Sequence, residues 1–181
     1  MADHDKTLLI LDMDETLIHA SEKRLEPTLD CKVGPYFVYR RPFLDNFLLK
    51  CQQGFRLAVW SSSSADYLQA VLQATIPSEI KFEFAWSRER CTQRFDGEWQ
   101  QYYYLKDLKK IKRLGYDLDR VLIVDDTPKK VERNYGNAIY IKPFYGSEID
   151  KELKLLSDYL DSLRYKQNIR CIEKRNWRSC Y

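Results

Sequence analysis

The chain has 181 residues, which is enough for one well-packed domain and too few for two comfortable ones. Hydrophobic residues make up 44% of it and charged residues 31%, which is typical of a soluble globular protein. The net charge is only +3, so the composition excludes a strongly basic body, and nucleic-acid partners are not expected.

The first third of the chain alternates short apolar runs with helix-like periodicity. An apolar run at 7–12 ends in a carboxylate and predicts a buried strand. Residues 27–39 contain Val-Gly-Pro followed by four strand-forming residues, which suggests a small hairpin. Apolar residues at helical spacing predict a helix over 42–51, and residues 55–60 predict the next strand.

The same alternation continues to residue 163. The pattern predicts helices at 65–74, 105–114 and 149–163, and strands at 81–86, 121–124 and 138–141. Strands that alternate with helices indicate parallel βαβ units with helices on both faces of the sheet. We therefore expect an α/β fold, with ligands bound at the carboxyl ends of the strands.

Two of the strongest strand runs end in acidic residues. Asp12 and Asp14 follow the first run, and Asp125 and Asp126 end the run at 121–124. Like charges this close repel each other and require a cation or a proton, and Mg²⁺ is a hard cation that takes oxygen ligands. One carboxylate could then attack phosphorus while another moves a proton. Each acid pair also has a simpler interpretation. The first pair could be an acidic turn after the strand, and the second could be acids at the N-terminus of a helix that begins near Pro128, where the helix dipole favours them.

Two weaker signals accompany these acids. Four serines, Ser61 to Ser64, follow the strand at 55–60, where hydroxyls and turn amides suit a phosphate but also cap helices. Lys106 lies at the start of a predicted helix, where a positive charge is mildly unfavourable. If Lys106 neutralised a phosphate or the nucleophile, that interaction would compensate for the unfavourable position. The alternative is that Lys106 is an ordinary surface lysine with no role at a site.

Together these residues form four motifs in a fixed order. The motifs are Asp-Met-Asp-Glu-Thr-Leu at 12–17, Trp-Ser-Ser at 60–62, Lys-Asp-Leu at 106–108 and Val-Leu-Ile-Val-Asp-Asp-Thr-Pro at 121–128. In this order they resemble the motifs of the haloacid dehalogenase superfamily. The stretches at 41–48 and 114–120 narrow the resemblance to its small CTD-phosphatase branch, also called the NLI-interacting-factor-like family. The resemblance covers about residues 7–163.

The resemblance implies roles for particular residues of the first three motifs. Asp12 is expected to be the nucleophile that forms an aspartyl-phosphate, and Asp14 the acid that protonates the leaving group and later activates water. Thr16 would position this loop. Lys106 would hold the charges of the phosphate and the nucleophile. Ser61 would bind a phosphate oxygen, with Ser62 beside it at the substrate.

The resemblance also implies a Mg²⁺ cofactor. Its ligands would be Asp12, the backbone carbonyl of Asp14, and one or both of Asp125 and Asp126. This branch often has Asp-Asn at the last pair, so the Asp-Asp of this chain leaves open which of the two binds the metal directly.

The spacing between the motifs limits any cap over the site. Only 24 residues separate Thr16 from Arg41, and 41 separate Ser64 from Lys106. We expect a Rossmann-like core with a central, mostly parallel sheet flanked by helices, a flap hairpin, a small β insertion at about 87–103, and no large cap domain. Residues 1–165 would form this single domain.

An open site favours a phosphorylated protein or peptide as the substrate. The insertion is rich in arginine and aromatic residues, which would either form a ledge for a peptide or pack the insertion onto the body. Arg88 lies where relatives place an arginine that contacts the substrate. The function expected is hydrolysis of phosphoserine or phosphothreonine in proteins. The alternatives are a small-molecule phosphomonoesterase and a binding scaffold with a retired site.

Residues 166–181 form a basic tail of net charge +4. We expect this tail to be solvated or packed on the body, and the alternative is that it contacts an acidic partner.

The five cysteines are scattered and show neither the spacing of a zinc site nor that of a redox motif, so we expect reduced thiols. Neither a signal peptide nor a membrane span is predicted. The expected location is cytoplasmic, or nuclear if the source is eukaryotic, and the oligomeric state is left open.

Overall fold

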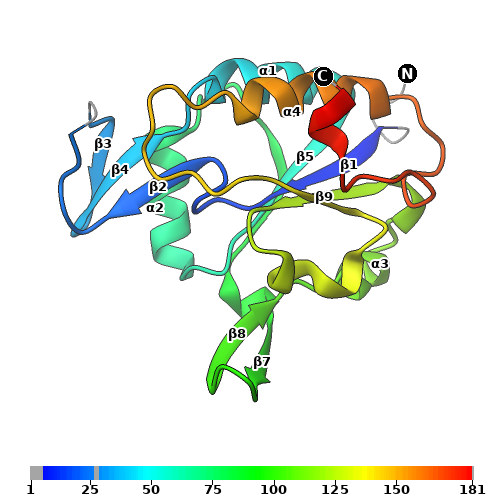
Figure 1. Cartoon of the computed structure of the whole chain (residues 1–181), viewed down its shortest axis with the longest axis horizontal. Coiled ribbons are helices and arrows are strands. Elements are labelled where there is room, and N and C mark those ends of the chain that lie inside the picture. Colours follow the sequence, from blue (N-terminus) through cyan, green and yellow to red (C-terminus); the bar gives the residue numbers. More distant parts are fainter. Residues whose placement is uncertain (1–5, 27–28, 181) are drawn as a thin grey trace.

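The computed structural model describes residues 6–26 and 29–180. Its centre is a five-stranded parallel sheet in the order β10-β9-β1-β5-β6. The strands are β1 (Thr7–Leu11), β5 (Phe55–Trp60), β6 (Phe82–Trp86), β9 (Val121–Asp125) and β10 (Ala138–Tyr140). Helices cover both faces of this sheet (Figure 1), which confirms the predicted fold class.

The two central strands are apolar except for Thr7 and Asp125 at their ends, because both of their faces are covered. Every residue of β1 and β9 is buried. Leu9 and Leu11 pack into one hydrophobic cluster, whereas Leu8 and Ile10 pack into a second cluster on the opposite face. Successive side chains of a strand point to opposite faces, so each run of the sequence serves both clusters.

Each cluster includes its own helices. The first contains buried residues of α1 (Leu44–Gly54), α2 (Ala65–Thr75) and α4 (Glu152–Leu163), and α1 and α4 lie side by side in Figure 1. The second contains residues of the short helix α3 (Lys109–Arg113) and of the 3₁₀ segment η4 (Pro128–Asn134). A further 3₁₀ turn, η3 (Leu118–Arg120), precedes β9.

The predicted helix at 105–114 is shorter in the structure. Leu105 is the last residue of a strand, where it pairs with Thr92, and the helix begins only at Lys109. Gly115 follows the helix with φ +92°, a left-handed conformation that glycine adopts without steric cost. Lys106 therefore lies in the connection before α3, and the expected conflict with a helix dipole does not arise.

A small three-stranded sheet lies beside the carboxyl end of β1. Its order is β2 (Ile18–Ser21), β4 (Tyr36–Arg40), β3 (Cys31–Val33), with antiparallel pairs. Strands β3 and β4 form the hairpin expected at 27–39, although residues 27–28 lie outside the described part of the chain. Strand β2 was not predicted; its four residues, Ile-His-Ala-Ser, are too short an alternation to indicate a strand by themselves. We call these three strands the flap.

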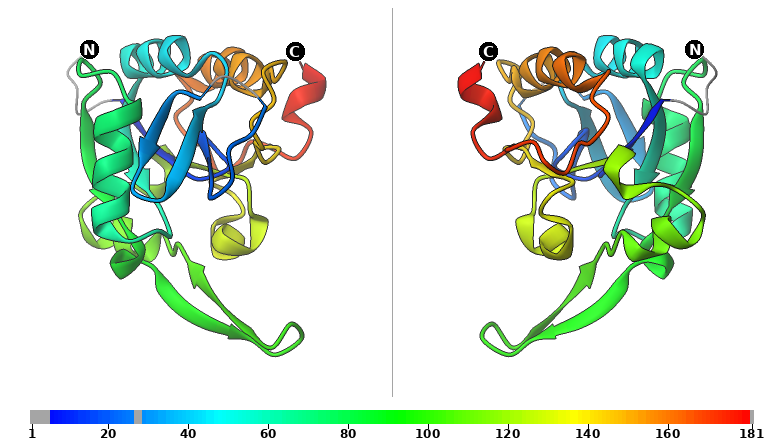
Figure 2. Two further views of the ribbon diagram at one scale, coloured as in Figure 1. Left: turned by 90° about the vertical axis from the view of Figure 1, so that its left-hand side faces the viewer. Right: turned by 90° about the vertical axis from the view of Figure 1, so that its right-hand side faces the viewer.

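The insertion between β6 and α3 is a hairpin that projects from the body (Figures 1 and 2). After the 3₁₀ turn η2 (Arg88–Arg90), strand β7 (Thr92–Asp96) pairs antiparallel with β8 (Gln101–Leu105). No other inserted domain is present among the described residues.

The C-terminal segment packs on the body. Ile169 is fully buried and Trp177, at the start of the 3₁₀ turn η5 (Trp177–Cys180), is 1% exposed. The indole Nε1 of Trp177 donates to the carbonyl of Tyr140 at 2.9 Å, so the segment covers the edge strand β10. Among the helices of the described residues, none combines the length and the apolar character that crossing a membrane requires.

Candidate active site

The carboxyl ends of three neighbouring strands bring the predicted site residues together. Asp12 follows β1, Ser61 follows β5, and Asp125 ends β9. The parallel register aligns Leu11 with both Val59 and Val124, and the Asp12 amide donates to the carbonyl of Val124 at 3.0 Å. Strand pairing therefore places residues from three distant parts of the chain at one edge of the sheet.

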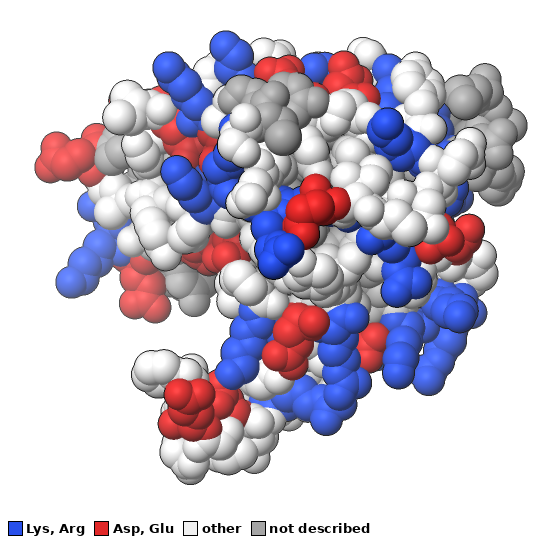
Figure 3. Space-filling view, turned by 45° about the vertical axis from the view of Figure 1, so that its right-hand side comes forward, with Lys and Arg blue, Asp and Glu red and all other residues white. Residues whose placement is uncertain are grey.

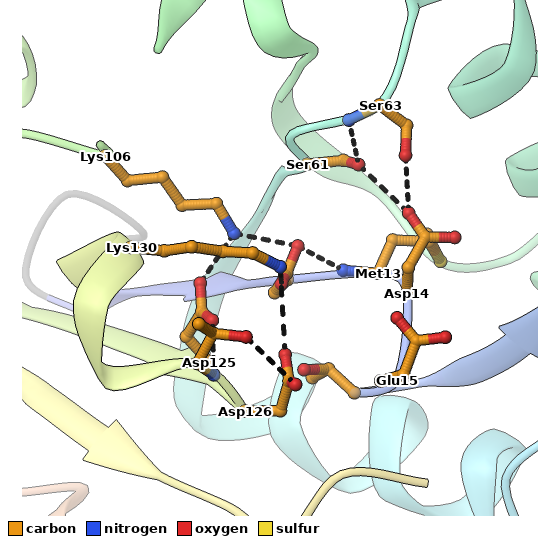
Figure 4. A network of polar contacts seen from close by, with 12 residues as sticks. Met13, Asp14, Glu15, Ser61, Ser63, Lys106, Asp125, Asp126 and Lys130 are labelled. Carbon is orange, nitrogen blue, oxygen red and sulfur yellow. Dashed lines mark hydrogen bonds and ion pairs between the residues drawn. The ribbon is translucent and has the colours of Figure 1, made fainter. Parts of the chain in front are cut away.

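Three carboxylates and a lysine form the buried centre of this site (Figure 4). Ligand oxygens of Asp12, Asp125 and Asp126 lie within 4.8 Å of one another. Lys106, fully buried, places its Nζ 2.7 Å from Asp12 Oδ1 and 2.6 Å from Asp125 Oδ2. A buried lysine between two buried carboxylates offsets part of their mutual repulsion.

The pKa values of these groups reflect burial and their neighbours. Burial alone would raise the pKa of Asp12, but the charges of Lys106 and Lys130 hold it below its ordinary value. Burial and the nearby Asp12 raise the pKa of Asp125 to about 6. Burial would lower the pKa of Lys106, yet Asp12 and Asp125 raise it. Asp12 is therefore an anionic carboxylate beside an ammonium group, the form that a nucleophile requires.

A second lysine at the site was missed by the sequence reasoning. Lys130 Nζ lies 3.3 Å from Asp12 Oδ2 and 3.9 Å from Asp126 Oδ1. Its pKa is raised by Asp12 and Asp125, although burial acts in the opposite direction. The available signal was its position four residues after Asp126, because a Lys at that spacing on a helical turn faces the acid.

The acidic centre fits a divalent cation. The donors are carboxylate oxygens, as Mg²⁺ prefers. Asp126 Oδ1 is buried and accepts no hydrogen bond within the described structure. Burial raises the pKa of Asp126, and the charge of Lys130 offsets only part of that rise. Asp12, Asp125 and Asp126 are the residues that would hold the ion.

Asp14 lies apart from this cluster. Its carboxylate accepts hydrogen bonds from Ser63 Oγ at 2.6 Å, Ser61 Oγ at 3.3 Å and Tyr67 OH at 2.8 Å. Figure 4 shows the side chain turned toward the serines. Only its backbone carbonyl would remain for the predicted role in metal binding, which stays a prediction.

Asp14 also lines an open pocket of about 390 Å³ in front of the site. The other lining residues are Glu15, Ala20, Tyr36, Ser62, Ser63, Ser64, Tyr67, Arg88 and Lys130. Ser62 is half-buried there, and Arg88 is exposed with its guanidinium 5.6 Å from the ring centre of Tyr104 on the hairpin. The structure thus places two of the three predicted substrate-binding residues, Ser62 and Arg88, at the pocket. The third, Ser61, is fully buried and donates to Asp14 instead of lining the pocket.

Thr16 supports the loop after β1 through its backbone. Its carbonyl accepts from Arg41 Nη1 at 3.0 Å, and the fully buried Thr16 Oγ1 has no hydrogen-bond partner in the described structure. Arg41 also donates to both carboxylate oxygens of Asp150, each at 2.9 Å, and to the carbonyl of Lys142 at 2.8 Å. One buried guanidinium therefore holds the loop after β1 against the segments around Lys142 and Asp150.

Glu15, in the first motif, is a further group at the site to which the sequence assigned no role. Its φ is +56°, in the left-handed region that non-glycine residues rarely adopt. Burial, followed by the nearby Asp14, raises the pKa of Glu15 to about 7. The carboxyl contacts His19 Nδ1 at 3.2 Å, so it links the loop after β1 to the flap.

A parallel α/β sheet with aspartates at the ends of two central strands, a lysine between them and no large cap defines a phosphatase of the haloacid dehalogenase type. Comparison with known proteins specifies the family. Residues 7–170 match the family model described as NLI interacting factor-like phosphatase, and the chain belongs to that family.

Curated relatives carry related names. The chain is 34% identical over 172 residues to CTD small phosphatase-like protein 2 of Dictyostelium discoideum, covering 91% of this chain and 29% of that protein. It is 30% identical over 183 residues to CTD nuclear envelope phosphatase 1 homolog of Drosophila melanogaster, covering 93% and 72%. The chain thus spans well under half of the first relative and most of the second.

A solved structure shares the fold. The RNA polymerase II CTD phosphatase Fcp1 of fission yeast superimposes with a TM-score of 0.60 at 17% identity, covering 90% of this chain and 50% of that one. At this level of identity the likeness concerns the fold.

Proposed function

We propose that this protein is a Mg²⁺-dependent phosphatase that acts through an aspartyl-phosphate on Asp12. The observation that carries the proposal is the state of Asp12. It is 1% exposed, ion-paired with two lysines, and set beside two further carboxylates at the end of the central strand. A buried carboxylate neutralised on both oxygens suits in-line attack on a phosphate whose own charge must also be neutralised.

The reaction has two steps. An Asp12 oxygen attacks phosphorus, the bond to the leaving-group oxygen breaks, its electron pair stays on that oxygen, and Asp14 supplies a proton to it. Water then attacks the phosphorus and Asp14 takes its proton. The bond between phosphorus and the Asp12 oxygen breaks, which releases phosphate and restores the carboxylate. Asp14 stands at the open pocket, where it could reach both the leaving group and water.

Positive charge at the site has three sources in this proposal. Bound Mg²⁺ would supply charge neutralisation between Asp12, Asp125, Asp126 and the phosphate. Lys106 holds the Asp12 and Asp125 carboxylates in place from within the core. Lys130 is 21% exposed at its side chain, lines the pocket, and is available to a phosphate oxygen.

A phosphorylated segment of a protein is the proposed substrate class. The pocket is open, and the described residues include no domain that would close over it. Arg88 connects the pocket to Tyr104 on the projecting hairpin, which suits an extended peptide better than a small metabolite. The relatives named above are CTD phosphatases, which supports a protein substrate and an intracellular site of action, cytoplasmic or nuclear. Phosphoserine and phosphothreonine are the side chains we expect.

The first test is hydrolysis of para-nitrophenyl phosphate by the wild type and by Asp12→Asn, with Mg²⁺ and with a chelator. We expect turnover that requires the metal and falls by at least about 10³-fold in the variant, because the nucleophile is lost. Circular dichroism checks that the variant is folded. Full activity in folded Asp12→Asn would contradict the proposal. A metabolite panel that exceeds phosphopeptides in kcat/KM would instead favour a small-molecule phosphomonoesterase.

A further inference from the structure

Three hydroxyl groups hold both oxygens of the Asp14 carboxylate. Ser61 and Ser63 donate to Oδ2, and Tyr67 donates to Oδ1. The serines belong to the loop after β5, and Tyr67 lies in the first turn of α2. In Figure 4 Asp14 points to these serines and away from the carboxylates around Lys106. The loop and helix that follow β5 therefore set the direction of a side chain that follows β1.

Orientation matters for Asp14 because the proposed mechanism asks it to give a proton in one step and to take one in the next. A carboxyl group that turns about its own side-chain bonds would miss the leaving-group oxygen. A hydroxyl can either donate or accept, so its contact with Asp14 can persist when the proton moves. Tyr67 alone serves Oδ1 in the described structure, whereas two serines share Oδ2.

Tyr67 is itself held in place. Its helix is anchored in the core through Leu68 and Val71, which are 3% and 0% exposed. Its ring meets the ring of Tyr36 from the flap edge-on, with centroids 5.6 Å apart and an interplanar angle of 80°. Because both the helix and the ring of Tyr67 are packed, its hydroxyl has a fixed position. The hydrogen bond from this hydroxyl therefore restricts the rotation of the Asp14 carboxylate.

We propose that Tyr67, assisted by Ser63, is a positioning residue that aims the Asp14 carboxyl at the leaving-group oxygen. This inference rests on the proposed function. Tyr67 acts through Asp14, and its hydroxyl exchanges no atom with the substrate. Loss of the Tyr67 hydroxyl is therefore expected to lower kcat/KM most for the substrates whose leaving group most needs a proton.

The test compares kcat/KM for a series of aryl phosphates that differ in the acidity of the phenol released. This constant reports the steps up to cleavage of the bond between phosphorus and the leaving-group oxygen. A dinitrophenolate leaves without a proton, whereas an unsubstituted phenolate needs one. In Tyr67→Phe we expect kcat/KM to stay within about twofold for the dinitrophenyl ester but to fall about 10- to 100-fold for phenyl phosphate.

Three further variants separate positioning from structure. Ser63→Ala removes the 2.6 Å donor to Oδ2 and should steepen the leaving-group dependence in the same direction. Tyr36→Phe removes a hydroxyl from the same pocket, but its contact with this network is the ring of Tyr67. It should keep the wild-type leaving-group dependence, whatever its absolute rate. In Asp14→Asn, which abolishes the proton transfer, adding Tyr67→Phe should cause no further loss for phenyl phosphate.

Two results would overturn the inference alone while the wild type remains active. One is a uniform fall of kcat/KM across the series in folded Tyr67→Phe, which indicates a merely structural role. The other is an additive loss in the double variant with Asp14→Asn. Absence of hydrolysis of every ester by folded, Mg²⁺-loaded wild type would overturn the proposed function, and this inference with it.

Discussion

Lys106 and Lys130 contact opposite oxygens of Asp12 but lie in different surroundings. Lys106 is fully buried and bridges Asp12 to Asp125, so both of its ion pairs are internal. Lys130 comes from η4 and lines the pocket. A phosphate that enters the pocket meets Lys130 before it meets Lys106. In the proposed mechanism, Lys106 therefore holds the nucleophile and Lys130 receives the substrate.

We predict that Lys130→Met lowers kcat/KM for para-nitrophenyl phosphate by about 100-fold, because one preorganised donor to the transferred phosphoryl group is lost. Steady-state kinetics at saturating Mg²⁺ measure this change. The adjacent Lys129 is the matched control, since its ion pair is with Asp96 of the hairpin. Lys129→Met should stay within about twofold of the wild type, as expected for a partly exposed ion pair. Equal effects of the two substitutions would refute a specific role for Lys130.

At the scale of elements, the hairpin β7–β8 has two different faces. One face carries Phe95 and Tyr102, which pair across the strands with ring centroids 5.1 Å apart and are 53% and 66% exposed. Tyr104 lies on this face too, two residues along β8, where Arg88 covers it beside the pocket. The opposite face carries Tyr103, whose hydroxyl donates to Glu132 of η4 at 2.9 Å. One face therefore holds the hairpin to the body and the other is open.

We predict that Tyr102→Ala raises KM for a phosphopeptide by about tenfold, because an exposed aromatic contact is worth about 0.5–1.5 kcal/mol beyond the area that it buries. The KM for para-nitrophenyl phosphate should not change, since that ester is too small to reach the hairpin. Tyr103→Ala, on the face toward η4, serves as the matched control and should leave the peptide KM close to that of the wild type. A peptide KM that does not respond to Tyr102→Ala would place the substrate elsewhere.

At the scale of the whole molecule, the C-terminal segment closes the hydrophobic core. Trp177 stacks on Tyr159 of α4 with ring centroids 5.6 Å apart, and its indole donates to the carbonyl of Tyr140 on β10. Lys174, 5% exposed, donates to the carbonyls of Gly136, Ile169 and Ile172 at 2.6–2.9 Å. The ammonium group of Lys174 is therefore satisfied by internal carbonyls, whereas Arg170 and Arg175 of the same segment are exposed. Elsewhere on the molecule, lysines and arginines gather at the lower right of the surface in the view of Figure 3, with acidic residues among them.

We predict that Trp177→Ala lowers the free energy of unfolding by about 3–5 kcal/mol, through lost burial and the cavity left between α4 and β10. Urea denaturation followed by circular dichroism measures this difference. Tyr165→Ala is the control, because Tyr165 is 65% exposed and should change stability by about 0.5 kcal/mol or less. Identical urea midpoints for Trp177→Ala and the wild type would show that the segment is dispensable for the fold.

The strand pattern and the order of motifs were readable from the sequence because they depend on local chemistry. A strand covered on both faces must be apolar throughout, so the runs that become β1 and β9 stood out, and so did the acids that end them. Short motif spacing left no room for a large cap, and residues 6–26 and 29–180 form none. Boundaries were less accurate where tertiary pairing decided them, as at Leu105, which extends a strand instead of starting a helix.

The sequence by itself determined the α/β class and the expectation that Asp12 and the acids at 125–126 meet at one edge of a sheet. Only the tertiary structure added Lys130 and Tyr67 to the groups around Asp12 and Asp14. Lys130 contacts Asp12 across 118 residues of chain, and Tyr67 contacts Asp14 across 53. Neither contact leaves a periodic signal, because it depends on how a loop or a helix packs against a strand rather than on the residues next to it.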